Sequence, residues 1–254
     1  MTADLSAYEP PPVSTTVDKP LDVRALLASE WARDRLATIG ATTDRALQAE
    51  LGPSEIGQAC PRRLAYRIAR TPIINMPDPL KAMFGTGLHA VIADGLRRMG
   101  PPGRYLIEHP VNYRGIGGVL DLHDRLPKRA TDWKTTTKQR IAKYRADGPP
   151  PNYVAQVNIY AAGLMAQGEQ VDTVALTFIP RDGELADIWT WTSVPRQEVA
   201  DAAIARYDAI ARMEAEAGGP AGVAAEPSNL CPWCPNYRPT ATDLAVACPG
   251  KDTP

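Results

Sequence analysis

The chain has 254 residues, a formal net charge of −1 and an apolar fraction of 44%. These values fit a globular protein with one sizeable core, or two small ones, and exclude both a wholly disordered chain and a small disulfide scaffold. No run of about eighteen apolar residues occurs, and the N-terminus lacks a basic segment followed by an apolar stretch. We therefore expect no membrane span, no secretory signal and a cytoplasmic protein, in which nucleic-acid binding would need a local basic patch.

The N-terminal half of the chain predicts helices. Residues 1–20 are rich in Pro, Ser and Thr and predict a disordered tail, and residues 21–50 show helical spacing of apolar residues. A second helix is expected from Pro53 through Ile68. After an extended, proline-rich connector, a third helix is expected over residues 81–99, where Gly100 and two prolines follow.

Beyond residue 100 the apolar period changes to two, which predicts strands. The expected strands cover residues 104–113, 117–125, 129–134, 171–180 and 186–193. Helices are expected over 152–167 and 195–217. The order of helices, three strands, helix, two strands and helix predicts an α/β fold, with a mixed β-sheet flanked by helices in a single domain over residues 51–254.

Two of the expected strands carry carboxylates that can approach each other. Asp132 and Lys134 share one face of a strand, and Asp121 lies on the strand before. Two converging carboxylates, with the Trp133 carbonyl as a further oxygen, suit Mg²⁺ or Mn²⁺. Lys134 is then placed to orient or deprotonate a water that attacks phosphorus. A solvated strand edge with a salt bridge is the alternative interpretation.

Side chains outside these strands extend the candidate site. His89 on the third helix is a possible metal ligand, although a helix histidine often only bonds a backbone carbonyl. Gln156 and Tyr160 lie four residues apart, hence on one helical face, where they can grip a phosphate or simply be partly buried. Glu108 is a weaker supporting acid. Asp124 is a rival to Asp121, but it should face the other side of the strand.

The chain has four cysteines, each followed within one residue by proline. Cys60 stands alone in the second expected helix. Cys231 and Cys234 form a CxxC pair, a common metal-binding spacing, and Cys248 follows. Three interpretations remain open: a 4Fe–4S cluster, a structural Zn²⁺ site and unrelated buried thiols.

The motifs GTGLHAVI, GGVLDLHD, TDWKTTT and QVNIY, in this order, resemble the RecB-like branch of the PD-(D/E)xK nuclease superfamily. The resemblance implies a restriction-endonuclease-like fold and a metal-dependent DNA nuclease, with an exonuclease preferred. It implies that His89, Asp121 and Asp132 are the metal ligands. It implies that Lys134 orients the attacking water and that Gln156 and Tyr160 hold substrate.

The segments GPSEIGQACPRRLAY and CPWC…CPG resemble the iron–sulfur staple of CRISPR-associated exonucleases and the AddB nuclease domain. This resemblance implies a 4Fe–4S cluster that stabilises a C-terminal lobe. Its ligands would be Cys60, Cys231, Cys234 and Cys248.

The expected partner is DNA, single-stranded or with free ends, in a phage or CRISPR-type system for recombination, replication or DNA processing, alongside recombination or CRISPR adaptation proteins. Basic residues near both motifs, among them Arg63, Arg67 and Lys138, are candidate phosphate contacts, or solvated basic surface. The alternative function is a catalytically auxiliary or redox-responsive DNA-binding protein that uses the cluster as a sensor or structural element.

Overall fold

The computed structural model of the chain describes residues 23–41, 51–76 and 78–250. The tail expected over 1–20 lies outside these residues, as does the 42–50 part of the expected N-terminal helical segment. Within the described ranges, no helix combines the length and the apolar character needed to cross a membrane.

In the described part of the chain, five strands form one mixed sheet in the order β1-β2-β3-β4-β5. The strands are β1 (Tyr105–Tyr113), β2 (Ile116–Asp124), β3 (Arg129–Thr136), β4 (Thr173–Pro180) and β5 (Trp189–Ser193). The first three form an antiparallel meander, β3 and β4 are parallel, and β4 and β5 are antiparallel. The parallel pair requires a crossover connection, which two helices supply.

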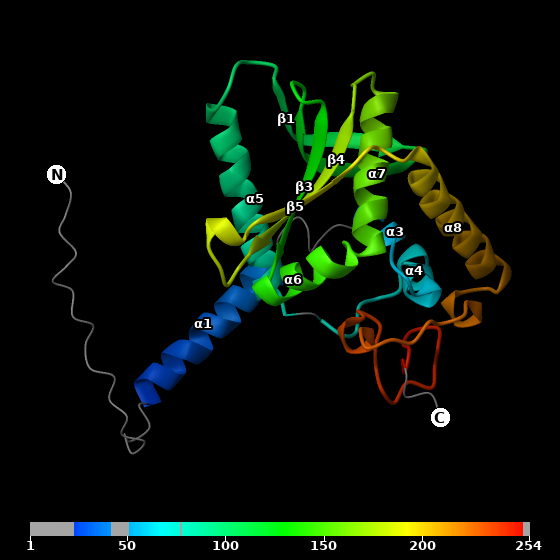
Figure 1. Cartoon of the computed structure of the whole chain (residues 1–254). Helices are drawn as coiled ribbons and strands as arrows, with labels where there is room; N and C mark the ends of the chain where they lie inside the picture. The colour runs from blue at the N-terminus through cyan, green and yellow to red at the C-terminus, as the bar shows by residue number, and fades with distance from the viewer. Residues whose placement is uncertain (1–22, 42–50, 77, 251–254) are drawn as a thin grey trace.

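Helices flank this sheet, as Figure 1 shows. The described helices are α1 (Val23–Ala41), α3 (Pro53–Ile56), α4 (Pro61–Ile68), α5 (Leu80–Arg98), α6 (Lys138–Asp147), α7 (Pro151–Ala166) and α8 (Gln197–Glu216). Of these, α1 contacts α5 and extends away from the sheet. Helix α5 packs against β1 and β3, and α7 packs against β1, β3 and β4, with α8 against its outer side. This arrangement confirms the expected α/β fold with a mixed sheet between helices.

The main core lies between the sheet and α7. Apolar side chains from both layers are almost fully buried there, among them Leu120, Val157, Leu164, Leu176 and Phe178. Helix α7 is buried along most of its length because it packs against the sheet, α8 and α3. Polar residues on α7 are therefore held in fixed positions by the surrounding packing.

The expectation of one helix from Pro53 through Ile68 is wrong. The structure has two short helices, α3 and α4, and Cys60 is the residue that precedes α4. Its backbone is extended (φ −70°, ψ 116°) because a proline disfavours the helical conformation of the residue before it, while Pro61 itself fits the first turn of a new helix. Cys60 thus lies in a turn rather than within a helix.

Hydrogen bonds attach the C-terminal segment to the chain around α4. The amide of Asn75 donates to the carbonyl oxygens of Pro232 and Cys234, both at 2.9 Å. The hydroxyl of Tyr66 donates to the carbonyl of Leu244 at 2.8 Å. Figure 1 shows this orange-to-red segment lying below α4.

Candidate active site

Strands β2 and β3 separate in the middle of the sheet. Their paired residues run from Asp124–Arg129 to Leu122–Thr131 and then stop. At the next position, the main-chain amide of Trp133 donates to the carboxylate of Asp121 at 2.6 Å. A side-chain oxygen thus satisfies the amide that loses its partner strand, and this bond fixes Asp121 at the point of divergence.

His89 reaches this point from α5. Its Nδ1 lies 3.2 Å from Oδ1 of Asp121, and its Nε2 lies 3.1 Å from the carbonyl oxygen of Trp133. Gly85, one turn earlier on α5, is buried against β3, where a Cβ would lie 3.3 Å from Oγ1 of Thr135. The small residue therefore allows the close approach of helix and strand that brings His89 to Asp121.

Glu108 completes a group of three possible metal ligands. By register it lies opposite Asp121, and it has a positive φ of 48°, which is strained for a non-glycine residue. Donor atoms of His89, Glu108 and Asp121 lie within 4.8 Å of one another. Partial burial, together with the nearby Asp121 carboxylate, raises the pKa of Glu108.

Asp132, Lys134 and Gln156 form a second group beside the first. The Lys134 ammonium lies 2.7 Å from Oδ2 of Asp132 and donates to Oε1 of Gln156 at 2.9 Å. The amide of Gln156 donates to Oδ1 of Asp132 at 3.3 Å and to the Tyr160 hydroxyl at 3.0 Å. Asp132 and Lys134 thus act on the same side of β3, as their spacing predicts.

Burial is the main influence on Asp132, which is 3% exposed. Burial raises the pKa of this carboxyl group, the Lys134 ammonium opposes the rise, and the neighbouring Asp121 adds to it. A bound cation would relieve the repulsion between these carboxylates, so the electrostatics of the site favour a cation.

Asp124, the rival to Asp121, has a different partner. Both of its carboxylate oxygens accept hydrogen bonds from the Arg104 guanidinium at 2.9 Å. This bidentate pair holds the pKa of Asp124 below its usual range. Asp124 is the last residue of β2, within the part that still pairs with β3, and its side chain binds Arg104.

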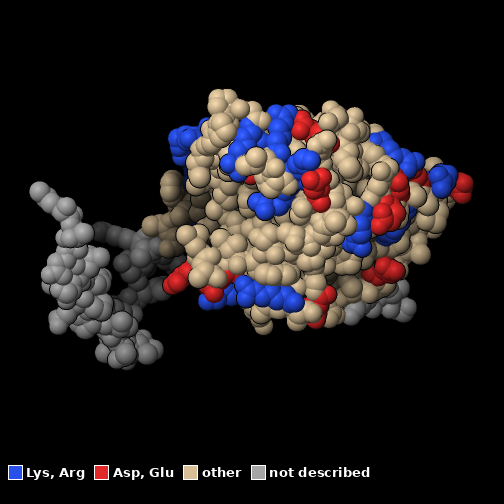
Figure 2. All heavy atoms as spheres, turned by 45° about the horizontal axis from the view of Figure 1, so that its top comes forward, with Lys and Arg blue, Asp and Glu red and all other residues tan. Residues whose placement is uncertain are grey.

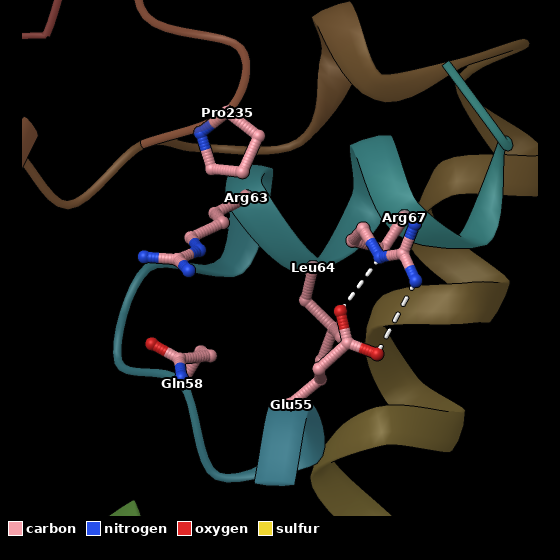
Figure 3. A pocket seen from close by; sticks show the side chains of 6 residues that line it. All are labelled: Glu55, Gln58, Arg63, Leu64, Arg67 and Pro235. Carbon is pink, nitrogen blue, oxygen red and sulfur yellow. Dashed lines mark hydrogen bonds and ion pairs between the residues drawn. The ribbon is translucent and has the colours of Figure 1, made fainter. Parts of the chain in front are cut away.

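The three basic residues expected to contact substrate occupy different environments. Arg67 pairs with both oxygens of Glu55, at 2.7 and 3.3 Å, beside a small hollow that Arg63 also lines (Figure 3). Lys138, at the start of α6, lies 3.0 Å from a carboxylate oxygen of Asp187. Figure 2 shows basic and acidic side chains interspersed over the face it presents, with no single extended basic field there.

All four cysteines are free thiols. The pKa of Cys234 is raised, and burial is the main cause. Cys60 and Cys248 are near enough to Cys234 to raise its pKa further. The C-terminal segment therefore brings its cysteines toward the turn before α4. The guanidinium of Arg62 also contacts the sulfur of Cys248, at 4.0 Å.

The sulfur atoms are not tightly clustered. Among the described residues, no three of the four sulfurs lie within 4.8 Å of one another. Two of them have main-chain donors: the amide of Glu226 lies 3.4 Å from the sulfur of Cys60, and the amide of Ser228 lies 3.2 Å from that of Cys231.

Sequence reasoning missed one residue in the site. The ring centroid of Tyr153 lies 4.9 Å from the Lys134 ammonium nitrogen. Tyr153 precedes Gln156 by three residues and Tyr160 by seven, so all three share one face of α7. This periodicity was the available signal.

A scan against protein-family models gave no match, and a search among curated proteins gave none either. Solved structures to which the chain is similar include the following three. The crystal structure of SSO0001 matches with a TM-score of 0.49 and 16% identity, over 89% of this chain and 98% of that chain. The alkaline exonuclease LHK-Exo from Laribacter hongkongensis matches with a TM-score of 0.47 and 12% identity, over 66% and 89%. A phage-related exonuclease from Haemophilus somnus 129PT matches with a TM-score of 0.40 and 13% identity, over 69% and 83%.

Proposed function

We propose that the chain is a metal-dependent DNA exonuclease that hydrolyses phosphodiester bonds. The observation that carries this proposal is the convergence of Asp121, His89 and the Trp133 carbonyl where β2 and β3 separate, with Asp132 and Lys134 beside them. Carboxylates, an imidazole and a lysine at one point on a sheet are the groups that metal-assisted phosphodiester hydrolysis needs.

The residues present fit a divalent cation. We assign binding of Mg²⁺ or Mn²⁺ to Asp121, Asp132, His89 and the Trp133 carbonyl, and we add Glu108, whose donor atom lies near those of His89 and Asp121. Carboxylate and carbonyl oxygens are the donors that these ions prefer. Because a ligating histidine must be neutral, one His89 nitrogen would exchange its present oxygen neighbour for the ion. The bound ion supplies Lewis-acid polarisation of the phosphodiester.

The neighbouring residues supply positioning and charge. Lys134 orients the attacking water, and its ammonium stabilises the negative charge that develops on the phosphate. Gln156 links Lys134, Asp132 and Tyr160 through its amide group, and we assign Gln156 and Tyr160 to holding the substrate.

We propose DNA with free ends as the substrate, with a preference for single strands, in a phage or CRISPR-type pathway of recombination, replication or DNA processing. Helix α6 follows the active-site strand directly and carries Lys138, Arg140, Lys143 and Arg145. These charges, together with Arg63, are the proposed contacts to DNA phosphates. Arg67, Lys138 and Lys143 would contribute by exchanging their ion pairs with Glu55, Asp187 and Asp147.

We also propose that the four cysteines hold a 4Fe–4S cluster. The support for a shared site is the position of Cys60 and Cys248 near Cys234, although these residues lie far apart in the chain. The CxxC spacing of Cys231 and Cys234 fits such a site as well. The cysteines would then cross-link the C-terminal segment to the turn before α4.

An anaerobic purification tests the cluster. We expect about four iron atoms per chain and a broad absorption near 400 nm, both lost in Cys234→Ser. A protein that contains zinc and no iron would show a structural zinc site in place of the cluster. A folded protein without metal would contradict both the cluster and the zinc site.

A cleavage assay on linear and covalently closed single-stranded DNA tests the exonuclease. We expect degradation of the linear substrate only, in Mn²⁺ or Mg²⁺ and not in EDTA. Cutting of the closed circle would indicate an endonuclease. DNA binding without cleavage would favour the auxiliary or redox-responsive alternative.

A further inference from the structure

The surroundings of the Lys134 ammonium are well defined. This side chain is only 14% exposed. Two of its directions are taken by oxygens, Oδ2 of Asp132 at 2.7 Å and Oε1 of Gln156 at 2.9 Å, and the ring of Tyr153 lies on a further side. An ammonium group has three donors, and the hydrogen bond to Gln156 and the ion pair with Asp132 engage at most two of them, which leaves one for the attacking water of the proposed reaction.

Tyr153 is itself held by an aromatic cluster. Phe178 on β4 is the register partner of Lys134 on β3, and its ring centroid lies 6.2 Å from that of Tyr153. Tyr144 of α6 packs on Phe178 at 5.0 Å, and Trp189 of β5 stacks on it at 5.6 Å. The ring that faces Lys134 therefore rests on Phe178, which residues of two further elements pack against.

We propose that Tyr153 is a positioning residue, whose ring face holds the Lys134 ammonium in place for the chemistry. The proposal rests on the nuclease function and deepens it. A lysine has a flexible four-carbon stem, and the ring adds a further contact to those that Asp132 and Gln156 make with its ammonium group. The attraction between an ammonium and an aromatic face grows as water is excluded, and this lysine is largely removed from water.

Three variants separate this role from simple packing. We expect Tyr153→Leu to lower kcat by roughly 3- to 30-fold with little change in KM, since the lost attraction acts on the chemical step. Tyr153→Phe keeps the ring and should retain kcat within about twofold. The matched control is Tyr144→Leu, which removes a ring from the same cluster but has no contact with Lys134, and it should retain kcat.

A measurement without DNA tests the contact independently of the nuclease function. We would compare the thermal unfolding of Tyr153→Leu, Lys134→Met and the double variant. The loss in Tm caused by Tyr153→Leu should be clearly smaller when Lys134 is already absent. Additive losses would overturn the inference, as would equal losses of kcat in Tyr153→Leu and Tyr144→Leu. A non-additive cycle in a protein that cleaves no DNA would instead reject the nuclease function while supporting the contact.

Discussion

The carboxylate of Asp121 accepts a hydrogen bond from the main-chain amide of Trp133 at the first position where β2 and β3 no longer pair. This bond links Asp121 to Trp133, and the carbonyl oxygen of Trp133 in turn lies next to Nε2 of His89. One strand residue thus presents its amide to one candidate ligand and its carbonyl to another. The separation of the strands is what makes both groups available.

Removing the carboxylate of Glu108 should weaken metal binding. We expect Glu108→Gln to reduce the affinity for Mn²⁺ by roughly 10- to 100-fold, because the group of three ligand atoms loses one charge. Isothermal titration with Mn²⁺ alone measures this change. Glu216→Gln, at the exposed end of α8, is the control and should leave the affinity as it is. An unchanged affinity in Glu108→Gln would remove this residue from the site.

Two adjacent glycines on β2 should respond differently to alanine. A Cβ on Gly118 would lie 2.8 Å from Cδ of Pro53 and 2.9 Å from the ring of Tyr160. We expect Gly118→Ala to destabilise the fold by about 1–3 kcal/mol, because a packed ring and a backbone segment must move. Gly117→Ala, whose Cβ meets nothing nearer than 3.7 Å, should cost less than about 1 kcal/mol. Urea denaturation measures both, and equal effects would contradict this packing.

The ion pair between Asp124 and Arg104 should stabilise the protein in a pH-dependent way. Because Arg104 holds the folded-state pKa of Asp124 below its unfolded value, the stabilisation is present above the unfolded pKa of about 4 and disappears as the pH falls through the folded pKa. We expect Asp124→Asn to cost about 1.5–3 kcal/mol at pH 7. This difference in the free energy of unfolding should shrink at pH 3. A difference that is the same at both pH values would contradict the ion-pair account.

The contacts of Asn75 should control the attachment of the C-terminal segment. Its side-chain amide donates to two carbonyls within the CxxC turn, those of Pro232 and Cys234. We expect Asn75→Ala to increase hydrogen exchange in residues 228–238, while α8 remains protected as an internal reference. If exchange in residues 228–238 is unchanged, the Asn75 side chain is not needed to hold this segment in place.

Much of the fold could be predicted from the chain itself. Alternation of apolar residues located the strands, and the two-residue period placed Asp132 and Lys134 on one side of β3, where the structure has them in contact. Helical spacing likewise paired Gln156 with Tyr160, which are hydrogen-bonded. These features depend on local periodicity, which a single sequence carries.

Other features depend on tertiary geometry. The separation of β2 and β3, the positive φ of Glu108 and the position of Tyr153 over Lys134 depend on how the strands and α7 pack together, so no local pattern reports them. The break at Cys60 was readable from Pro61, but the helical spacing of neighbouring apolar residues concealed it.

The most direct test of the proposed active site compares two aspartates on the same strand. With Mn²⁺ and a linear single-stranded DNA, we predict that Asp121→Asn lowers cleavage at least about 100-fold, because it removes a ligand from the metal site. Asp124→Asn, measured at a temperature where it is folded, should cleave at a rate within a few-fold of the unsubstituted protein. Cleavage by Asp121→Asn at the unsubstituted rate would contradict the account.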